Sequence, residues 1–229
     1  MNVIGGKEQD GSYILDNTSR NLLILHPDIL LSGTAISESF ECQRRSVLND
    51  RIRSLSTANA ANVYGQLLHE VFQHCLLEMN FDNDVMDQFI RRLVEIKVND
   101  IWAVGENEVT AVEHLKEYAI GMREWWNRYG SLEPLPDALV SEHRGDGMSK
   151  TTMSLHKVLG VEENIWSPMY GVKGKIDVGV QVKYRFGNNQ QDAVDVAVPL
   201  EFKTGKSFGG AMHRAQTILY SLLMSDRYG

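Results

Sequence analysis

The clearest strand-like sequence in the chain is GKIDVGVQVKYR, residues 174–185, in which β-branched residues surround a single acid, Asp177. A carboxylate inside such a strand costs desolvation energy unless it binds a partner. Half-exposed strands also carry aspartates that simply face solvent. Asp177 alone therefore leaves both interpretations open.

A second acid occurs in the next strand-like run, which contains PLEFK at residues 199–203. Glu201 and Lys203 lie two apart, so in a strand both side chains point to the same face. If this strand pairs with the one that carries Asp177, two carboxylates and an ammonium group converge. Paired carboxylates can hold Mg²⁺ or Mn²⁺, and a neighbouring lysine can neutralise charge on an attacked phosphate. The alternative is a local salt bridge between Glu201 and Lys203.

The rest of the chain combines helices with short strands. Apolar residues recur at helical spacing across residues 63–129, which predicts a long helical region. The other predicted elements are short strands within 12–36, a basic cluster around Cys42 within 37–53, an irregular connection at 142–157, strands at 161–167, 174–185 and 194–204, a hairpin turn at 187–189 and a helix at about 213–226.

The composition is that of an ordinary globular chain. With 229 residues, 43% hydrophobic, the sequence is long enough for one large domain or two small ones. No apolar run approaches the roughly 18 residues that a membrane span needs. Two cysteines make a secreted disulfide framework improbable. The formal charge of -7 argues against a uniformly basic surface but leaves room for a local phosphate-binding groove.

Polar residues share one face of the predicted C-terminal helix. His213, Gln216 and Tyr220 are spaced i, i+3 and i+7. A separate apolar face is expected from Ile218, Leu219, Leu222 and Leu223. The polar face could position Lys203 and bind a phosphate backbone, whereas Tyr220 could equally be a core tyrosine.

These residues together resemble the RecB-like branch of the PD-(D/E)XK nuclease superfamily. The resemblance is carried by Gly174, Ile176, Asp177, Glu201, Lys203, Gln216 and Tyr220. More narrowly, the chain is similar to the nuclease domain of the eukaryotic DNA replication ATP-dependent helicase/nucleases, which process Okazaki-fragment flaps. That similarity lies in HPD (26–28), LLSGT (30–34), CQRRSVL (42–48), GQLLHEVF (65–72), EENIWSP (162–168), PLEFKTGK (199–206) and HRAQ (213–216).

The resemblance implies an α/β fold with a restriction-endonuclease-like core, a mixed sheet flanked by helices. It implies a β-rich segment at 1–40 and a nuclease domain at 41–229, helical over 62–130 and with its catalytic sheet and helix over 161–227. The implied Mg²⁺ or Mn²⁺ ligands are His69, Asp177, Glu201 and the Phe202 carbonyl. Lys203 would be the catalytic lysine, and Gln216 and Tyr220 would order the site.

Relatives of this type also carry a 4Fe–4S cluster on four cysteines. Cys42 matches the first ligand, while Cys75 falls on an apolar helix face and is expected to be a core residue. We therefore expect the chain to be truncated at its C-terminus relative to the family. The resemblance further implies single-stranded or flap DNA as substrate, a helicase domain in the full-length protein, a single-strand-binding protein as partner, no membrane, and a nuclear location with a mitochondrial one as an alternative.

Two functional classes remain open on the sequence. The first is a metal-dependent DNA nuclease acting in replication and repair. The second is a catalytically idle DNA-binding or docking module built on an incomplete nuclease fold. The presence of every expected catalytic side chain favours the enzyme.

Overall fold

The computed structural model describes residues 2–16, 21–52, 59–140, 151–186, 193–204 and 210–228. Its helices are α1 (Gly33–Ser39), α2 (Gln43–Arg51), α3 (Ala60–Leu77), α4 (Asn83–Ile96), α5 (Val98–Ala103), α6 (Glu108–Tyr129) and α7 (Ala211–Tyr228). Its strands are β1 (Asn2–Ile4), β2 (Leu22–Ile24), β3 (Leu31–Ser32), β4 (Thr151–Ser167), β5 (Val172–Phe186) and β6 (Ala193–Leu200).

These elements form two compact units. The first unit comprises Met1–Arg53, Asn164–Lys175 and Gly209–Gly229, and the second comprises Ser54–Glu163 and Ile176–Phe208. The long strands β4 and β5 each contribute residues to both units, whereas α3 to α6 and β6 lie in the second unit alone.

A mixed sheet runs through the chain, with β5 as the strand on which the others pair. β3 pairs with β5 in parallel, β6 pairs with it antiparallel, and β4 is its third neighbour. The β5–β6 register runs from Val178 opposite Leu200 to Arg185 opposite Ala193. This pairing confirms that the strand preceding Glu201 lies beside the strand of Asp177. The chain is thus α/β, with an open mixed sheet and helices.

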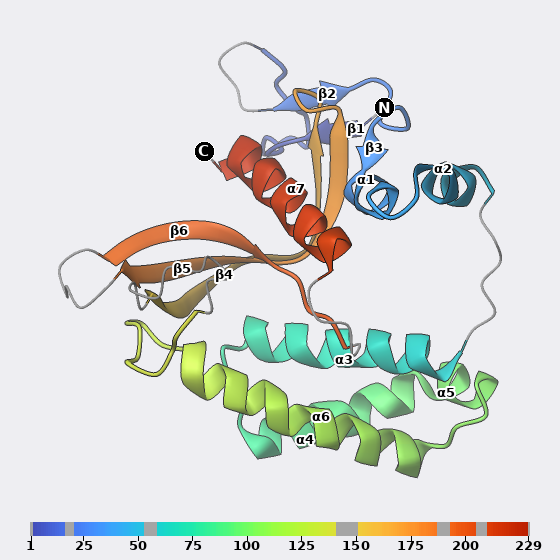
Figure 1. The fold of residues 1–229 in the computed structure, drawn as a ribbon, viewed down its shortest axis with the longest axis vertical. Helices are drawn as coiled ribbons and strands as arrows, with labels where there is room; N and C mark the ends of the chain where they lie inside the picture. The colour runs from blue at the N-terminus through green and yellow to red at the C-terminus, as the bar shows by residue number, and fades with distance from the viewer. Residues whose placement is uncertain are drawn as a thin grey trace. The chain divides into compact units, whose positions relative to one another are not determined.

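Helices α3 to α6 occupy the region in which helical spacing predicted them. Asn59 caps α3 by accepting from the Asn62 amide at 2.8 Å, and Asn107 caps α6 by accepting from the Thr110 amide at 3.0 Å. The long helical region is divided by turns, and positive φ angles occur at Met79 (49°) and Gly105 (80°). α3, α4 and α6 pack on one another, and Figure 1 shows the second-unit parts of β4, β5 and β6 side by side.

The core of the second unit joins these helices to the sheet. It is lined by apolar side chains that are almost fully buried: Leu67, Leu68, Val71, Cys75, Leu76, Ile90, Leu115, Leu155, Val178, Val180 and Val182. Cys75 is 0% exposed, which confirms its expected core position. Burying these side chains is the main favourable term that holds α3 against β5.

The first unit is built around α1, α7 and the parallel pair of β3 and β5. Ser46 of α2 donates its hydroxyl to the Ala35 carbonyl at 2.5 Å, which ties α2 to α1. The ring of Tyr220 on α7 lies against Gly174 of β5 and Gly33, the first residue of α1. A Cβ added at Gly174 would be 2.7 Å from Tyr220 Cε1, and one added at Gly33 would be 3.0 Å away. Glycine at these positions lets α7 approach the sheet.

Several expected elements differ in the structure. Residues 151–157, predicted as part of an irregular connection, belong to β4. The strand predicted to reach residue 204 ends at Leu200. Residues 33–36, expected among short strands, begin α1. The predicted turn at 187–189 lies outside the described residues.

The predicted apolar face of the C-terminal helix is also wrong. Ile218 and Leu222 are 62% and 41% exposed, whereas Leu223 and Met224 are buried together with Gln216 and Tyr220. The polar residues Gln216 and Tyr220 therefore share one buried face of α7 with Leu223 and Met224. In the part of the chain that the structure describes, no helix combines the length and hydropathy of a membrane span.

Candidate active site

Asp177 is held at the point where β6 ends. Because Val178 pairs with Leu200, the residues that follow β6 pass directly beside Asp177. The Phe202 amide donates to Asp177 Oδ2 at 3.1 Å, so the carboxylate fixes the course of the chain after the strand. The side chain of Asp177 is 18% exposed. It is therefore a functional candidate rather than a solvent-facing strand residue.

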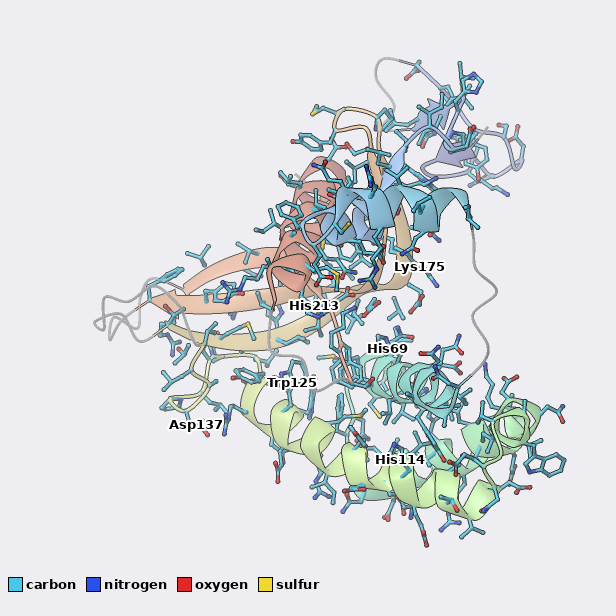
Figure 2. All side chains as sticks on the ribbon, turned by 45° about the vertical axis from the view of Figure 1, so that its right-hand side comes forward. His69, His114, Trp125, Asp137, Lys175 and His213 are labelled. Atoms are coloured by element: carbon cyan, nitrogen blue, oxygen red, sulfur yellow. The ribbon has the colours of Figure 1, made fainter. Side chains whose placement is uncertain are left out.

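His69 approaches the same carboxylate from α3. Its Nδ1 lies 3.5 Å from Asp177 Oδ2, and its side chain is 25% exposed. Figure 2 shows His69 on α3, with His114 and Trp125 on the neighbouring α6. The packing of α3 against β5 thus brings together two of the predicted site residues that lie far apart in the sequence.

Glu201 and Lys203 lie in the segment after β6. Lys203 Nζ donates to Glu201 Oε1 at 2.5 Å; the glutamate side chain is 11% exposed and the lysine side chain 44% exposed. Strand geometry predicted only that both side chains share one face, and a local salt bridge was the alternative. The structure contains that ion pair, and the strand has already ended at Leu200. The Phe202 amide bonded to Asp177 holds this segment instead, with Glu201 turned inward and Lys203 toward solvent.

The two carboxyl groups are electrostatically costly at this position. Burial raises the pKa of Asp177 above its ordinary value; His69, the Phe202 amide and Lys203 oppose that change, and Glu162 adds to it. Burial also raises the pKa of Glu201, and the neighbouring Asp177 raises it further, against the effect of the Lys203 ammonium. Half-buried acids that repel one another are typical of functional sites, where a cation offsets the repulsion.

The Phe202 side chain fastens this segment to α3. Its ring stacks on Phe72 with centroids 4.6 Å apart and an interplanar angle of 16°. It also meets His69 edge-on, with centroids 5.2 Å apart. The Phe202 ring therefore fixes the position of its own segment and also that of the His69 ring.

A further acid lies near Asp177 that the sequence analysis gave no role. Glu162 of β4 accepts a hydrogen bond at Oε1 from Gln73 Nε2 at 2.6 Å. Its charge is one of the causes that raise the pKa of Asp177. The signal in the sequence was the spacing of four residues between His69 and Gln73, which places both on one face of α3.

The donor set has the chemistry that a hard divalent cation accepts. As placed, no three His, Cys, Asp or Glu side chains gather closely enough to hold a metal ion among the residues that the structure describes. His69 and Asp177 already face one another, and Glu201 carries a buried carboxylate that is bonded to Lys203. Carboxylate oxygens are preferred ligands of Mg²⁺. The donor types of these residues therefore fit such an ion.

The cysteines of the chain do not fit an iron–sulfur cluster by themselves. Such a cluster needs four thiolates, and this sequence has two cysteines. Cys42 is exposed, at the residue before α2. Cys75 is buried, and that burial raises the pKa of its thiol to about 12. Of the two thiols, only that of Cys42 is exposed.

The remaining predicted residues, Gln216 and Tyr220, belong to the first unit. Gln216 Nε2 donates to Tyr220 Oη at 3.1 Å, and both side chains are buried. Tyr220 is thus a core tyrosine of the first unit, which was one of the two interpretations that the sequence left open. Whether the pair orders the acidic residues of the second unit stays a prediction.

The fold and the site together define a class: an α/β protein in which acids, a histidine and a lysine gather beside the end of two paired strands. Comparison with known proteins gives the family. The model of the family described as "DNA replication factor Dna2" matches residues 1–182. The chain therefore belongs to the Dna2 family of DNA replication factors.

Curated relatives extend the similarity beyond the matched region. The chain is 35% identical, over its whole length, to the "DNA replication ATP-dependent helicase/nuclease JHS1" of Arabidopsis thaliana, covering 17% of that protein. It is 31% identical to the chicken (Gallus gallus) DNA2 helicase/nuclease over 97% of the chain, and 32% identical to the human (Homo sapiens) protein over 90%. It covers 22% and 20% of those two proteins. The chain thus spans about a fifth of the length of the curated relatives it matches.

Proposed function

We propose that this chain is a metal-dependent nuclease domain of the PD-(D/E)XK superfamily that cleaves single-stranded DNA or 5′ flaps in DNA replication and repair. The proposal is carried by one observation: Asp177, Glu201, Lys203 and His69 converge at the end of the β5–β6 pair. Burial raises the pKa of both carboxyl groups there. The names of the relatives, which include nuclease and helicase activity, support the same conclusion.

In the proposed reaction, one group of side chains binds a cation and another contacts the phosphate. Asp177, Glu201, His69 and the Phe202 carbonyl would hold a Mg²⁺ or Mn²⁺ ion. When bound, this ion supplies charge stabilisation at the attacked phosphate. Hydrolysis forms a bond between a water oxygen and phosphorus and breaks one ester bond, and the proton from water ends on the leaving oxygen.

Lys203 is suited to the phosphate itself. Its side chain is 44% exposed and its Nζ lies 2.5 Å from Glu201 Oε1, so the ammonium group is open to a phosphate that approaches the carboxylates. A fixed positive charge there stabilises the negative charge that grows on the phosphate oxygens during attack. Lys203 therefore acts as a transition-state stabiliser in this proposal.

The wider setting follows from the family. We propose single-stranded or flap DNA as the substrate, a helicase domain and a single-strand-binding protein as partners of the full-length protein, and the nucleus as the location. Cys42 is proposed as one ligand of an iron–sulfur cluster that requires further cysteines. The names of the relatives support the helicase and replication parts of this setting.

A second candidate function rests on the contact between Lys203 and Glu201. An ion pair at 2.5 Å is also what an idle site would contain, with the lysine serving as counter-ion to a buried acid. The chain would then be a DNA-binding or docking module without activity.

Cleavage of a labelled oligonucleotide separates the two functions. The purified chain is incubated with a 5′-labelled single strand and with a flap substrate, in Mg²⁺, in Mn²⁺ and in excess chelator. The nuclease proposal expects shortened products with either metal and none with chelator. DNA binding without products, in both metals, would favour the idle module.

A further inference from the structure

Glu162 has a backbone conformation that side-chain-bearing residues rarely adopt. Its φ angle is 53°, although it lies within strand β4. The left-handed region is costly for a residue with a Cβ, and glycine adopts it freely. Such outliers persist where the surroundings require a particular side chain, and they cluster at functional sites.

The side chain of Glu162 reaches α3. Its Oε1 accepts from Gln73 Nε2 at 2.6 Å, and Gln73 is 8% exposed. Gln73 lies four residues after His69, one turn further along the same helical face. α3 therefore contacts the sheet through two polar side chains one turn apart: His69 meets Asp177 of β5, and Gln73 meets Glu162 of β4.

We propose that Gln73 and Glu162 are positioning residues of this site: their hydrogen bond fixes α3 against β4, so that His69 faces Asp177. This inference rests on the proposed nuclease function. It adds Gln73 and Glu162 as residues that support the proposed metal ligands His69 and Asp177. Partners of this kind orient ligands, and their loss typically lowers metal affinity or activity about tenfold to a hundredfold.

The experiment compares Gln73→Ala, Glu162→Ala, the double variant and Glu162→Gln, with Gln66→Ala on α3 and Glu117→Ala on α6 as controls at exposed positions. Two quantities are measured: the rate of oligonucleotide cleavage, and Mn²⁺ affinity by calorimetry in the absence of DNA. Each alanine variant is expected to lose about tenfold or more in both. The double variant should lose no more than the worse single variant, because one hydrogen bond is removed in all three.

The conservative variant tests the role of the hydrogen bond. Glu162→Gln keeps an acceptor for Gln73 and removes the charge, so it should stay within about threefold of the original chain in both measurements, since the bond is what positions α3. If it is as damaging as Glu162→Ala, charge rather than positioning is responsible and the proposal is overturned. Additive losses in the double variant would overturn it too.

Glu162→Gly guards against a simple folding defect. Glycine relieves the left-handed backbone, so this variant should unfold at the same or a higher urea concentration while still losing Mn²⁺ affinity. Full Mn²⁺ affinity in Glu162→Gly overturns the positioning role. If the original chain binds Mn²⁺ but cleaves no DNA, the nuclease proposal fails, while the affinity measurements still decide the role of Gln73 and Glu162.

Discussion

Gly174→Ala is expected to destabilise the first unit because no space exists there for a methyl group. The added Cβ would lie 2.7 Å from Tyr220 Cε1 and 2.8 Å from Leu223 Cδ1, whereas carbon atoms in contact prefer about 3.5–4.0 Å. Both neighbours are buried, at 3% and 0% exposed, so neither can swing into solvent. Overpacking costs about 1–3 kcal/mol, and alanine regains about 0.5–1 kcal/mol of backbone entropy. The two terms leave a net loss of about 0–2.5 kcal/mol in the free energy of unfolding. We expect about 1–2 kcal/mol, because two buried neighbours must shift at once.

The matched control is Gly121→Ala on α6, where a Cβ would meet nothing within 4 Å. Glycine inside a helix is unfavourable relative to alanine, so this variant should gain about 0.5–1 kcal/mol. Urea unfolding followed by circular dichroism should place the Gly174→Ala midpoint about 0.5–1 M below the original and the Gly121→Ala midpoint above it. A Gly174→Ala variant as stable as the original would refute the steric reasoning.

Three further predictions concern charge and thiol chemistry. In metal-free protein, Asp177→Asn should raise stability near about pH 7 but not near about pH 3. Burial raises the pKa of Asp177 in the folded chain above the unfolded value of about 4. The Asp177 carboxyl group therefore contributes to stability below the unfolded pKa, and this contribution is lost as the pH rises through the folded pKa. Urea midpoints at the two pH values check this, and an equal gain at both contradicts it. A native-state thiol assay near about pH 8 should count Cys42 alone, since a pKa of about 12 leaves Cys75 about 10⁻⁴ ionised; two equally fast thiols would show that the core is open. Lys203→Ala should lower turnover by on the order of 10² while calorimetry finds Mn²⁺ affinity retained; a collapse of affinity would make the lysine a structural counter-ion.

Much of the site was predictable because it is encoded in local pattern. The β-branched runs identified two strands, and their pairing followed from the short separation along the chain. That pairing alone brings Asp177 to the segment of Glu201 and Lys203. The inward turn of Glu201 after Leu200 depends instead on the Phe202 amide and on ring stacking with Phe72. Contacts of that kind are tertiary and leave no periodic signal in the sequence.

Other features could not be predicted from pattern. Residues 151–157 follow a Gly, Ser and Met-rich stretch, and they become strand only because they pair within the sheet. Glu162 reaches Gln73 with a left-handed backbone angle. A glycine at this position would have indicated such an angle in the sequence, whereas a glutamate does not. The apolar face of α7 was misassigned because Gln216 and Tyr220 satisfy each other and can therefore be buried.

The most direct test of the central claim is Asp177→Ala, assayed for cleavage and for DNA binding in the same preparation. Removing this carboxylate removes a proposed metal ligand and also a repulsion toward phosphate. The account predicts that metal-dependent cleavage of a labelled single strand disappears, while the dissociation constant for that strand stays the same or falls. Cleavage that persists in the variant, or a folded variant that loses cleavage and DNA binding together, would contradict it.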